Sequence, residues 1–375
     1  MMTLRHIVVL GLVAFLATYA LVPLVRKLAI KVDAVDYPDA RRVNTEPIPR
    51  MGGLAMIGGL LVAIVVELLG EHFLHWYGFF TTHTLGVNYL IVLAGALVVA
   101  AVGVVDDIKS IKPLAKLLGQ ILGAVIITLG GVLISHVSNP FGPGLIHFGW
   151  LAYPLTVIYL VVFMNAINLI DGLDGLAAGI VCIAAIALFS TSLFMWRVET
   201  AFLSMLLIGM TAAFLRYNFH PASIFMGDSG SLFLGMMIGV VSILGIMRAS
   251  TVVVLISPFI VAAIPFIDSL AAIIRRIKRH QPIQQADKDH LHHRLLRSGL
   301  NQRQAVGIVW GWTFLLGICA FLITMFPGWL TWLIVIVLIV ASFVIFYKTG
   351  IFEMVLRHYY NPRAQDGSES DESDK

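Results

Sequence analysis

The chain has 375 residues, of which 59% are hydrophobic and only 12% are Asp, Glu, Lys or Arg, whereas an ordinary soluble domain contains about 25% of these charged residues. A soluble protein of this size needs more polar surface than these side chains supply, so the composition excludes a soluble globule and predicts an integral membrane protein. The formal net charge of +4 leaves nucleic acid open as a partner until the charges are located. Cys182 and Cys319 lie inside apolar runs and predict packing rather than a disulfide framework.

Apolar runs of membrane-spanning length, about 20 residues each, recur along the chain and predict an all-α integral membrane protein with about eleven transmembrane helices. The predicted spans are residues 7–25, 51–70, 86–105, 114–135, 149–170, 175–195, 200–216, 231–247, 252–274, 305–326 and 328–347. Residues 1–350 are expected to form one membrane domain. Residues 351–375 are expected to form a cytoplasmic tail, whose acidic end lacks the apolar side chains needed to fold.

The orientation follows from the basic residues, which accumulate on the cytoplasmic side of membrane proteins. With an outside N-terminus and a cytoplasmic C-terminus, 22 of the 25 Lys and Arg residues fall in cytoplasmic segments, and the exceptions are Arg5, Arg197 and Arg248. The basic excess is therefore a cytoplasmic face, so we expect no nucleic-acid partner.

Five polar clusters interrupt the apolar pattern, and the predicted topology puts all five at the cytoplasmic face. Ionisable groups are costly in lipid and therefore indicate function. A transporter or flippase is the alternative from a different class, although it more typically holds such groups near the midplane of the bilayer. The loops expected to contain the functional residues are 26–50, 106–113, 171–175, 217–230 and 275–304.

The first cluster, at residues 36–53, has Arg50 shortly before Gly52 and Gly53. Two interpretations are open for it: a basic membrane anchor followed by a glycine-rich helix start, or a loop that binds an anion. In either case the paired glycines let the backbone approach another group closely.

The second cluster has adjacent carboxylates, Asp106 and Asp107, at the inner end of the third predicted span. Their mutual repulsion beside hydrocarbon favours neutralisation of one of them or a bound cation. Lys112, Lys116 and Gln120 follow at i, i+4 and i+8, so we expect one helix face whose ammonium groups hold a phosphate. Helix capping by an Asp, with lysines reaching the interface, is the alternative.

The third cluster contains Asn165, Asn168, Asp171 and Asp174, each three residues after the one before. Asp174 alone suits a helix N-cap, but four oxygen-bearing side chains at this spacing are hard to explain by capping. Hard oxygen ligands of this kind suit Mg²⁺ that is shared with a polyphosphate.

The fourth cluster places Asp228 between glycines and serines at the start of the eighth predicted span. This aspartate is either an N-cap or a metal ligand beside exposed backbone N–H groups. Phe225, three residues earlier, offers an aromatic face to a nucleotide base.

The fifth cluster contains His290, His292, His293 and Arg294 in a basic loop. Zinc is disfavoured there because the neighbours are basic and no cysteine is nearby, so phosphate binding is the preferred interpretation. Asp268, an acid inside the ninth predicted span, either pairs with the arginines of this loop or joins the site. Together the five clusters favour phosphoryl transfer between a lipid phosphate and a soluble nucleotide-linked donor.

Four of these motifs, in this order, resemble the polyprenyl-phosphate N-acetylhexosamine-1-phosphate transferase superfamily. They are Asp106 with Asp107, the segment 165–175, the segment 225–228 and the histidine motif at 290–293. The resemblance extends over about residues 30–304. It implies transfer of a sugar 1-phosphate from a UDP-sugar to undecaprenyl phosphate with release of UMP. It also implies dependence on Mg²⁺, with Mn²⁺ as an alternative ion.

The resemblance also implies roles for individual residues. Asp228 and Asn168 would be the metal ligands, and one of Asp106 or Asp107 would deprotonate the lipid phosphate. The uracil pocket would be formed by Asp174, Phe225, Asp171 and Asn165. The diphosphate would be held by His290, His292, His293 and Arg294. The lipid phosphate would be held by Lys112 and Lys116, with Arg50 and Asp268 as further candidates.

The substrate prediction depends on two details of these motifs. Leu291 separates the histidines, and the loop at residues 47–53 lacks the pattern of the phospho-MurNAc-pentapeptide branch. Both details resemble the branch that transfers GlcNAc 1-phosphate to start cell-envelope polysaccharides such as teichoic acid or O-antigen. UDP-GlcNAc, undecaprenyl phosphate and the bilayer of the bacterial cytoplasmic membrane are the expected partners. Another UDP-N-acetylhexosamine, UDP-MurNAc-pentapeptide and a homodimer stay open.

Overall fold

The computed structural model describes residues 4–38, 46–76, 78–79, 86–139, 144–246, 300–326 and 329–348, and these are mostly helical. The helices are α1 (Leu4–Lys31), α2 (Gly52–Leu74), α3 (Tyr89–Lys109), α4 (Pro113–Leu129), α5 (Ala152–Ile170), α6 (Leu176–Phe194), α7 (Val198–Asn218), α8 (Gly227–Ile246), α12 (Gln302–Met325) and α13 (Trp329–Lys348). A short 3₁₀ helix at Gly149–Leu151 leads into α5. Within these described ranges, eight helices are long and apolar enough to cross a membrane, which agrees with an all-α integral membrane protein.

The predicted apolar runs coincide with these ten helices, and the run at 252–274 lies outside the described residues. Some boundaries were wrong. The predicted loops at 106–113 and 217–230 are partly helical, because α3 continues to Lys109 and α8 already begins at Gly227. The predicted span 114–135 ends at Leu129, because Gly130 and Gly131 form a turn in which Gly131 has a φ of +97°.

Helix α8 lies at the centre of the described bundle and packs against α2, α3, α5, α6 and α7. In its apolar segment 89% of the residues are buried, against 33% in α1. Lipid and neighbouring helices are equally apolar surroundings, so this difference depends on packing rather than on hydropathy. Glycines let the neighbouring helices come close to α8. A Cβ on Gly235 would lie 2.5 Å from the carbonyl oxygen of Phe163 in α5.

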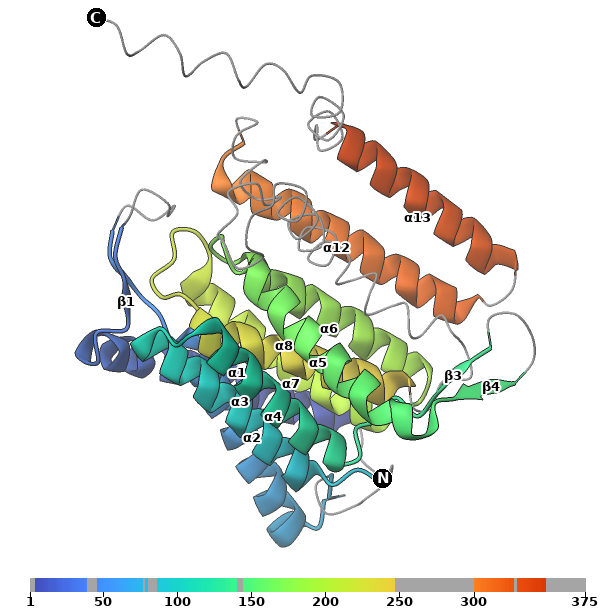
Figure 1. The fold of residues 1–375 in the computed structure, drawn as a ribbon, viewed down its shortest axis with the longest axis horizontal. Helices are drawn as coiled ribbons and strands as arrows, with labels where there is room; N and C mark the ends of the chain where they lie inside the picture. Colours follow the sequence, from blue (N-terminus) through green and yellow to red (C-terminus); the bar gives the residue numbers. More distant parts are fainter. Residues whose placement is uncertain are drawn as a thin grey trace, which may run out of the picture.

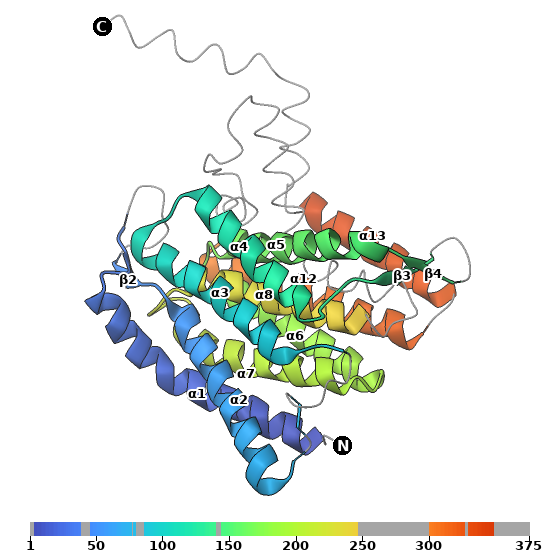
Figure 2. The same ribbon diagram turned by 60° about the horizontal axis from the view of Figure 1, so that its bottom comes forward.

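The other helices pack in pairs around this centre, α1 on α2, α3 on α4 and α6 on α7. Helix α12 packs on α6, and α13 packs on α12 at the edge of the bundle (Figure 1). Figure 2 shows α1 and α2 on the side away from α13.

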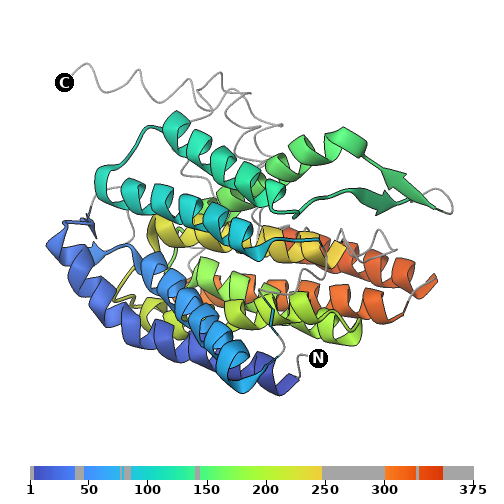
Figure 3. The same ribbon diagram turned by 90° about the horizontal axis from the view of Figure 1, so that it is seen from below.

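Two antiparallel hairpins connect helices at opposite ends of the bundle. Strands β1 (Val35–Asp36) and β2 (Ile48–Pro49) pair between α1 and α2, with Val35 opposite Pro49. Strands β3 (His136–Ser138) and β4 (Leu145–His147) pair between α4 and α5, and Figure 3 shows this hairpin projecting beyond the helices. The first hairpin lies at the end of the bundle where α8 begins, which is called the polar end below.

Candidate functional site

The N-terminus of α8 is held by the loop that leads into α2. The amide of Phe225 donates to the carbonyl of Pro49 at 2.8 Å, and the amides of Gly52 and Gly53 donate to the carbonyls of Phe225 and Met226, each at 2.9 Å. A Cβ on Gly53 would lie 2.0 Å from the backbone nitrogen of Gly230, so only glycine permits this approach. The paired glycines thus approach α8, and their amides are occupied by protein carbonyls. These two amides are therefore not available to an anion, and anion binding by the rest of the loop stays a prediction.

Asp107 caps α8 from the neighbouring helix α3. Its two carboxylate oxygens accept the amides of Asp228 at 2.8 Å and Ser229 at 3.1 Å, and the residue is only 2% exposed. These amides belong to the first turn of α8 and have no partner within that helix. The capping alternative, an Asp as the N-cap of the helix that follows it, was therefore wrong, because Asp107 lies in the last turn of α3 and caps α8 instead.

Asp106 has different partners, although it is adjacent in sequence. One oxygen accepts the amide of Ile111 at 2.7 Å, and the other lies 3.2 Å from the ammonium group of Lys116. The same ammonium group also forms an ion pair with the carboxylate of Asp228. Lys116 in α4 therefore joins carboxylates from α3 and α8.

The predicted lysine face is only partly correct. Lys116 reaches the carboxylates and Gln120 is bonded to Asn165 of α5. Lys112, in contrast, is the exposed N-cap residue of α4, with extended backbone at ψ 142°. Residues before a proline avoid the helical region, so Pro113 keeps Lys112 out of the helix and breaks the i, i+4, i+8 pattern. Among the described residues, no ion pair connects Lys112 to the carboxylates.

The two asparagines of α5 reach different neighbours. The amide nitrogen of Asn168 donates to Asp228 at 2.7 Å and to the hydroxyl of Ser231 at 2.8 Å. The amide nitrogen of Asn165 donates to the side chain of Gln120 at 2.6 Å. Asn168 is thus joined to the carboxylate cluster, whereas Asn165 connects α5 to α4. Ser231 was not among the predicted site residues.

Asp106, Asp228 and Asn168 provide the hard oxygen ligands that suit Mg²⁺. Within the described ranges no group of three or more His, Cys, Asp and Glu residues could hold a metal ion, so an ion here would have few protein ligands. Mg²⁺ is bound in that way when substrate phosphates supply further oxygens. Asn168 presents its nitrogen to Asp228, so its amide would have to turn to offer oxygen. With that rotation, and with the ammonium group of Lys116 moved away from Asp228, the residues fit the ion.

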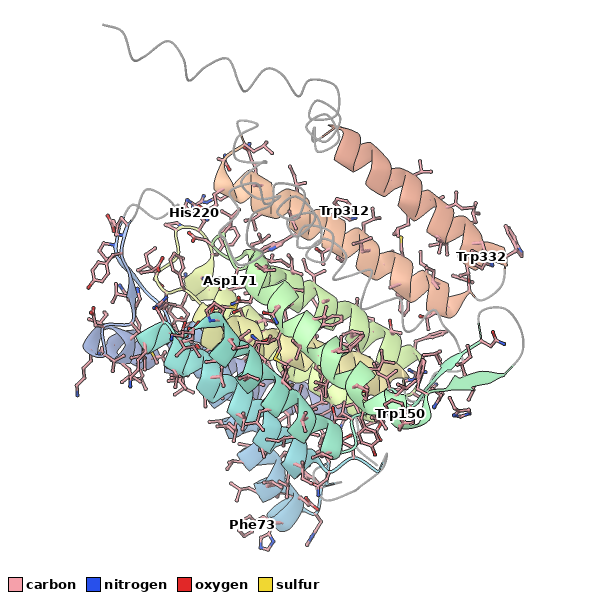
Figure 4. The ribbon with its side chains drawn as sticks, in the orientation of Figure 1. Phe73, Trp150, Asp171, His220, Trp312 and Trp332 are labelled. Carbon is pink, nitrogen blue, oxygen red and sulfur yellow. The ribbon has the colours of Figure 1, made fainter. Side chains whose placement is uncertain are left out.

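Asp171 lies in the turn between α5 and α6, at the same end of the bundle as His220 (Figure 4). Burial raises the pKa of its carboxyl to about 8, and the negative charges of Asp228, Asp107 and Asp174 act in the same direction. At neutral pH Asp171 is therefore mostly protonated and can donate a hydrogen bond as well as accept one.

Asp174 is held by the loop between α7 and α8. Its Oδ2 atom accepts Nδ1–H of His220 at 2.8 Å and the amide of Ala222 at 3.1 Å. Asn218, which is 2% exposed, accepts the amide of Gly175 at 3.0 Å and donates to the carbonyl of Ile224 at 3.0 Å. Asn218 and His220 were not among the predicted site residues, although two polar residues within four positions of the end of a predicted span were a usable signal.

Phe225 and Arg50 are both half-buried beside this loop. The Nε atom of Arg50 is buried and has no hydrogen-bond partner among the described residues. The remaining predicted residues lie outside the described ranges: His290, His292, His293, Arg294 and Asp268.

The fold and the cluster define a multi-pass membrane protein with carboxylate, amide and ammonium groups gathered at one end of its helices. Residues 89–246, which include α3 to α8, match the family model of Glycosyl transferase family 4. The chain is 38% identical over 346 residues to a Bacillus subtilis protein named probable undecaprenyl-phosphate N-acetylglucosaminyl 1-phosphate transferase, with 92% of this chain and 93% of that protein aligned.

Two further relatives extend this similarity. A decaprenyl-phosphate N-acetylglucosaminephosphotransferase of Mycolicibacterium smegmatis is 38% identical over 85% of this chain and 81% of its own. A phospho-N-acetylmuramoyl-pentapeptide-transferase of Desulforudis audaxviator is 30% identical over 80% of this chain and 92% of its own. The chain belongs to the polyprenyl-phosphate hexosamine-1-phosphate transferase family, as its motifs predicted, and it is a sugar-1-phosphate transferase.

Proposed function

We propose that this protein transfers N-acetylglucosamine 1-phosphate from UDP-GlcNAc to undecaprenyl phosphate and releases UMP. The observation that carries the proposal is the ammonium group of Lys116 between the carboxylates of Asp106 and Asp228, next to Asn168. The names of the Bacillus subtilis and Mycolicibacterium smegmatis relatives support the sugar. The family assignment disfavours the transporter alternative.

The active site would face the cytoplasm at the bacterial cytoplasmic membrane, in a chain of eleven spans. The distribution of 22 of 25 basic residues supports this orientation. It puts the cluster on the side where a soluble nucleotide sugar is available and a lipid phosphate lies at the membrane surface.

Asp106 is our candidate for the base. Both oxygens of Asp107 already accept amides of α8, whereas Asp106 contacts the side chains of Lys116 and Asp228 inside the cluster. Asp106 would take the proton of the lipid phosphate while Lys116 holds that phosphate. A phosphate oxygen then attacks the β-phosphorus of UDP-GlcNAc, and the bond from this phosphorus to the UMP oxygen breaks.

Asp228 and Asn168 would hold Mg²⁺, or alternatively Mn²⁺. When bound there, the ion would neutralise charge on the donor diphosphate. Direct attack by the lipid phosphate is preferred to a phosphorylated aspartate, because Asp228 is occupied when it binds the ion.

Recognition of the nucleotide would use Asp174, Asp171 and the ring of Phe225. Asn165 would support this pocket indirectly through Gln120. The diphosphate would be held by His290, His292, His293 and Arg294.

The test measures UMP release by the purified protein in detergent with undecaprenyl phosphate and Mg²⁺. UDP-GlcNAc, UDP-GalNAc and UDP-MurNAc-pentapeptide are compared side by side, because a 30% identical relative is named for the pentapeptide substrate. We expect the highest kcat/KM with UDP-GlcNAc and no release without a divalent ion. Preference for another donor overturns the assignment of the sugar, and no release with any donor overturns the reaction.

A further inference from the structure

The hydrogen bond between Asp174 and His220 uses one particular oxygen of the carboxylate. Both hydrogen bonds to the Asp174 carboxylate, from His220 and from the amide of Ala222, end on Oδ2. Within the described ranges, Oδ1 has no hydrogen-bond partner. A carboxylate oxygen accepts only, so Nδ1 of His220 carries the proton that joins the two side chains. The pair therefore fixes the plane of the carboxylate and leaves one oxygen available to a ligand.

Residues of helix α12 are hydrogen-bonded to the loop that contains His220 and to the start of α6, close to Asp174. The guanidinium group of Arg303 donates to the carbonyl of His220 from Nε at 3.3 Å and from a terminal nitrogen at 3.0 Å. The indole of Trp310, two turns further along α12, donates to the carbonyl of Leu176 at 3.4 Å, at the start of α6. A Cβ on Gly179 would lie 2.0 Å from this indole, so α12 and α6 are in close contact.

The start of α12 is itself well defined. Asn301 and Gln304 form a capping box, in which the Asn301 side chain accepts the Gln304 amide at 2.9 Å and the Gln304 side chain accepts the Asn301 amide at 3.0 Å. Such a cap removes fraying of the first turn. Arg303 therefore extends from a fixed point to the loop that holds Asp174.

We propose that His220 is a positioning residue for nucleotide recognition, held in place by Arg303. His220 keeps Oδ2 of Asp174 occupied, so that Oδ1 accepts the imide N–H of the uracil ring. The inference rests on the proposed function in taking a uridine nucleotide as the ligand and Asp174 as part of its pocket. His220 is not in the carboxylate and lysine cluster, so its contribution is to nucleotide affinity and not to the chemical step.

The experiment compares His220→Ala with His220→Asn in the full-length protein. Asparagine places an N–H donor close to the position of Nδ1 and should preserve the bond to Asp174, whereas alanine removes it. Loss of a hydrogen bond to a charged group corresponds to about tenfold in affinity. We expect His220→Ala to raise the KM for UDP-GlcNAc and the Kd for UMP by about this factor. Its kcat and its KM for undecaprenyl phosphate should stay within about twofold of the wild type, and His220→Asn should restore most of the affinity.

Arg303 supplies the second measurement. Arg303→Ala should raise the same two constants by a smaller factor, about two- to threefold, because its side chain is exposed. The double variant with His220→Ala should be no weaker than His220→Ala alone, since Arg303 acts through His220. His75→Ala, at the exposed far end of α2, is the matched histidine control and should change neither constant.

UMP binding is measured by calorimetry, without lipid and without turnover. The role of His220 in nucleotide affinity is therefore tested even when the protein does not catalyse the proposed reaction. If His220→Ala binds UMP as the wild type does, or if His220→Asn is as weak as His220→Ala, the proposal is overturned. A parallel rise in the KM for undecaprenyl phosphate also overturns it, because that pattern indicates general distortion of the polar end.

Discussion

The two ends of the helical bundle both contain buried charges, but they use them differently. At the end opposite the polar end, Glu67 is 1% exposed and accepts the amide of Phe79 at 2.7 Å. This bond joins a carboxylate side chain to a backbone group of a loop. At the polar end, Asp106, Lys116 and Asp228 contact one another directly.

This difference shows that burial of a charge does not by itself identify a functional site. A charge bonded to backbone stabilises local structure. Charged side chains from several helices that contact one another are costly to bury. Here three carboxylates, including that of Asp107, lie near one ammonium group, so negative charge is in excess. That excess of negative charge is suited to a cation and to phosphate chemistry.

The largest effect is expected at the centre of the polar end, from Asp228→Asn. The substitution keeps the shape but removes the charge that pairs with Lys116. Turnover should fall by about 100- to 1,000-fold, the range for loss of one electrostatic group in an active site. UMP release is measured over a Mg²⁺ titration, and we expect added Mg²⁺ not to restore it. Activity close to that of the wild type would exclude a metal role for Asp228.

The adjacent aspartates provide the next comparison. Asp106→Asn should lower turnover by about 100-fold, as expected for loss of a general base, without lowering the melting temperature in detergent. Asp107→Asn should instead destabilise the protein by about 1–3 kcal/mol, because one amide of α8 loses its acceptor. Thermal unfolding and UMP release are measured on both variants. The assignment of Asp106 as the base fails if the two variants exchange these phenotypes.

The next comparison asks whether turnover depends on the contact between a lysine and the carboxylates. Lys116 forms that contact, and Lys112 has no ion pair to them among the described residues. Lys116→Met should lower turnover by about 10- to 100-fold, because the lipid phosphate loses a hydrogen bond from a charged group. Lys112→Met is the matched control and should retain at least half of the activity, because Lys112 is exposed. Equal losses in the two variants would contradict a specific role for Lys116.

The smallest effect is expected at the opposite end, from Glu67→Gln. Glutamine keeps an oxygen that accepts the amide of Phe79, so both the melting temperature and the activity should change little. Glu67→Ala removes the acceptor and should cost about 1–3 kcal/mol of stability, while the kcat per folded protein stays within about twofold. A large loss of kcat in Glu67→Gln would contradict the interpretation that the buried charge at this end is structural and that only the polar end takes part in catalysis.

The sequence by itself determined the fold class and most helix positions, because the spans are long apolar segments and lipid penalises any other arrangement. It also identified candidate site residues, because Asp106, Asn168 and Asp228 are polar or charged side chains in a mostly apolar chain. The family followed from the order of these motifs, and the comparisons confirmed it.

Only the tertiary structure decided which of these residues meet and what each contact does. Adjacent aspartates look alike in a sequence, but helix geometry turns Asp107 to the amides of α8 and Asp106 to Lys116. The pairing of Asp174 with His220, 46 residues apart, follows from the packing of α6, α7 and α12. Periodicity reports the faces of one helix, whereas a site depends on the distances between several helices, which only packing determines.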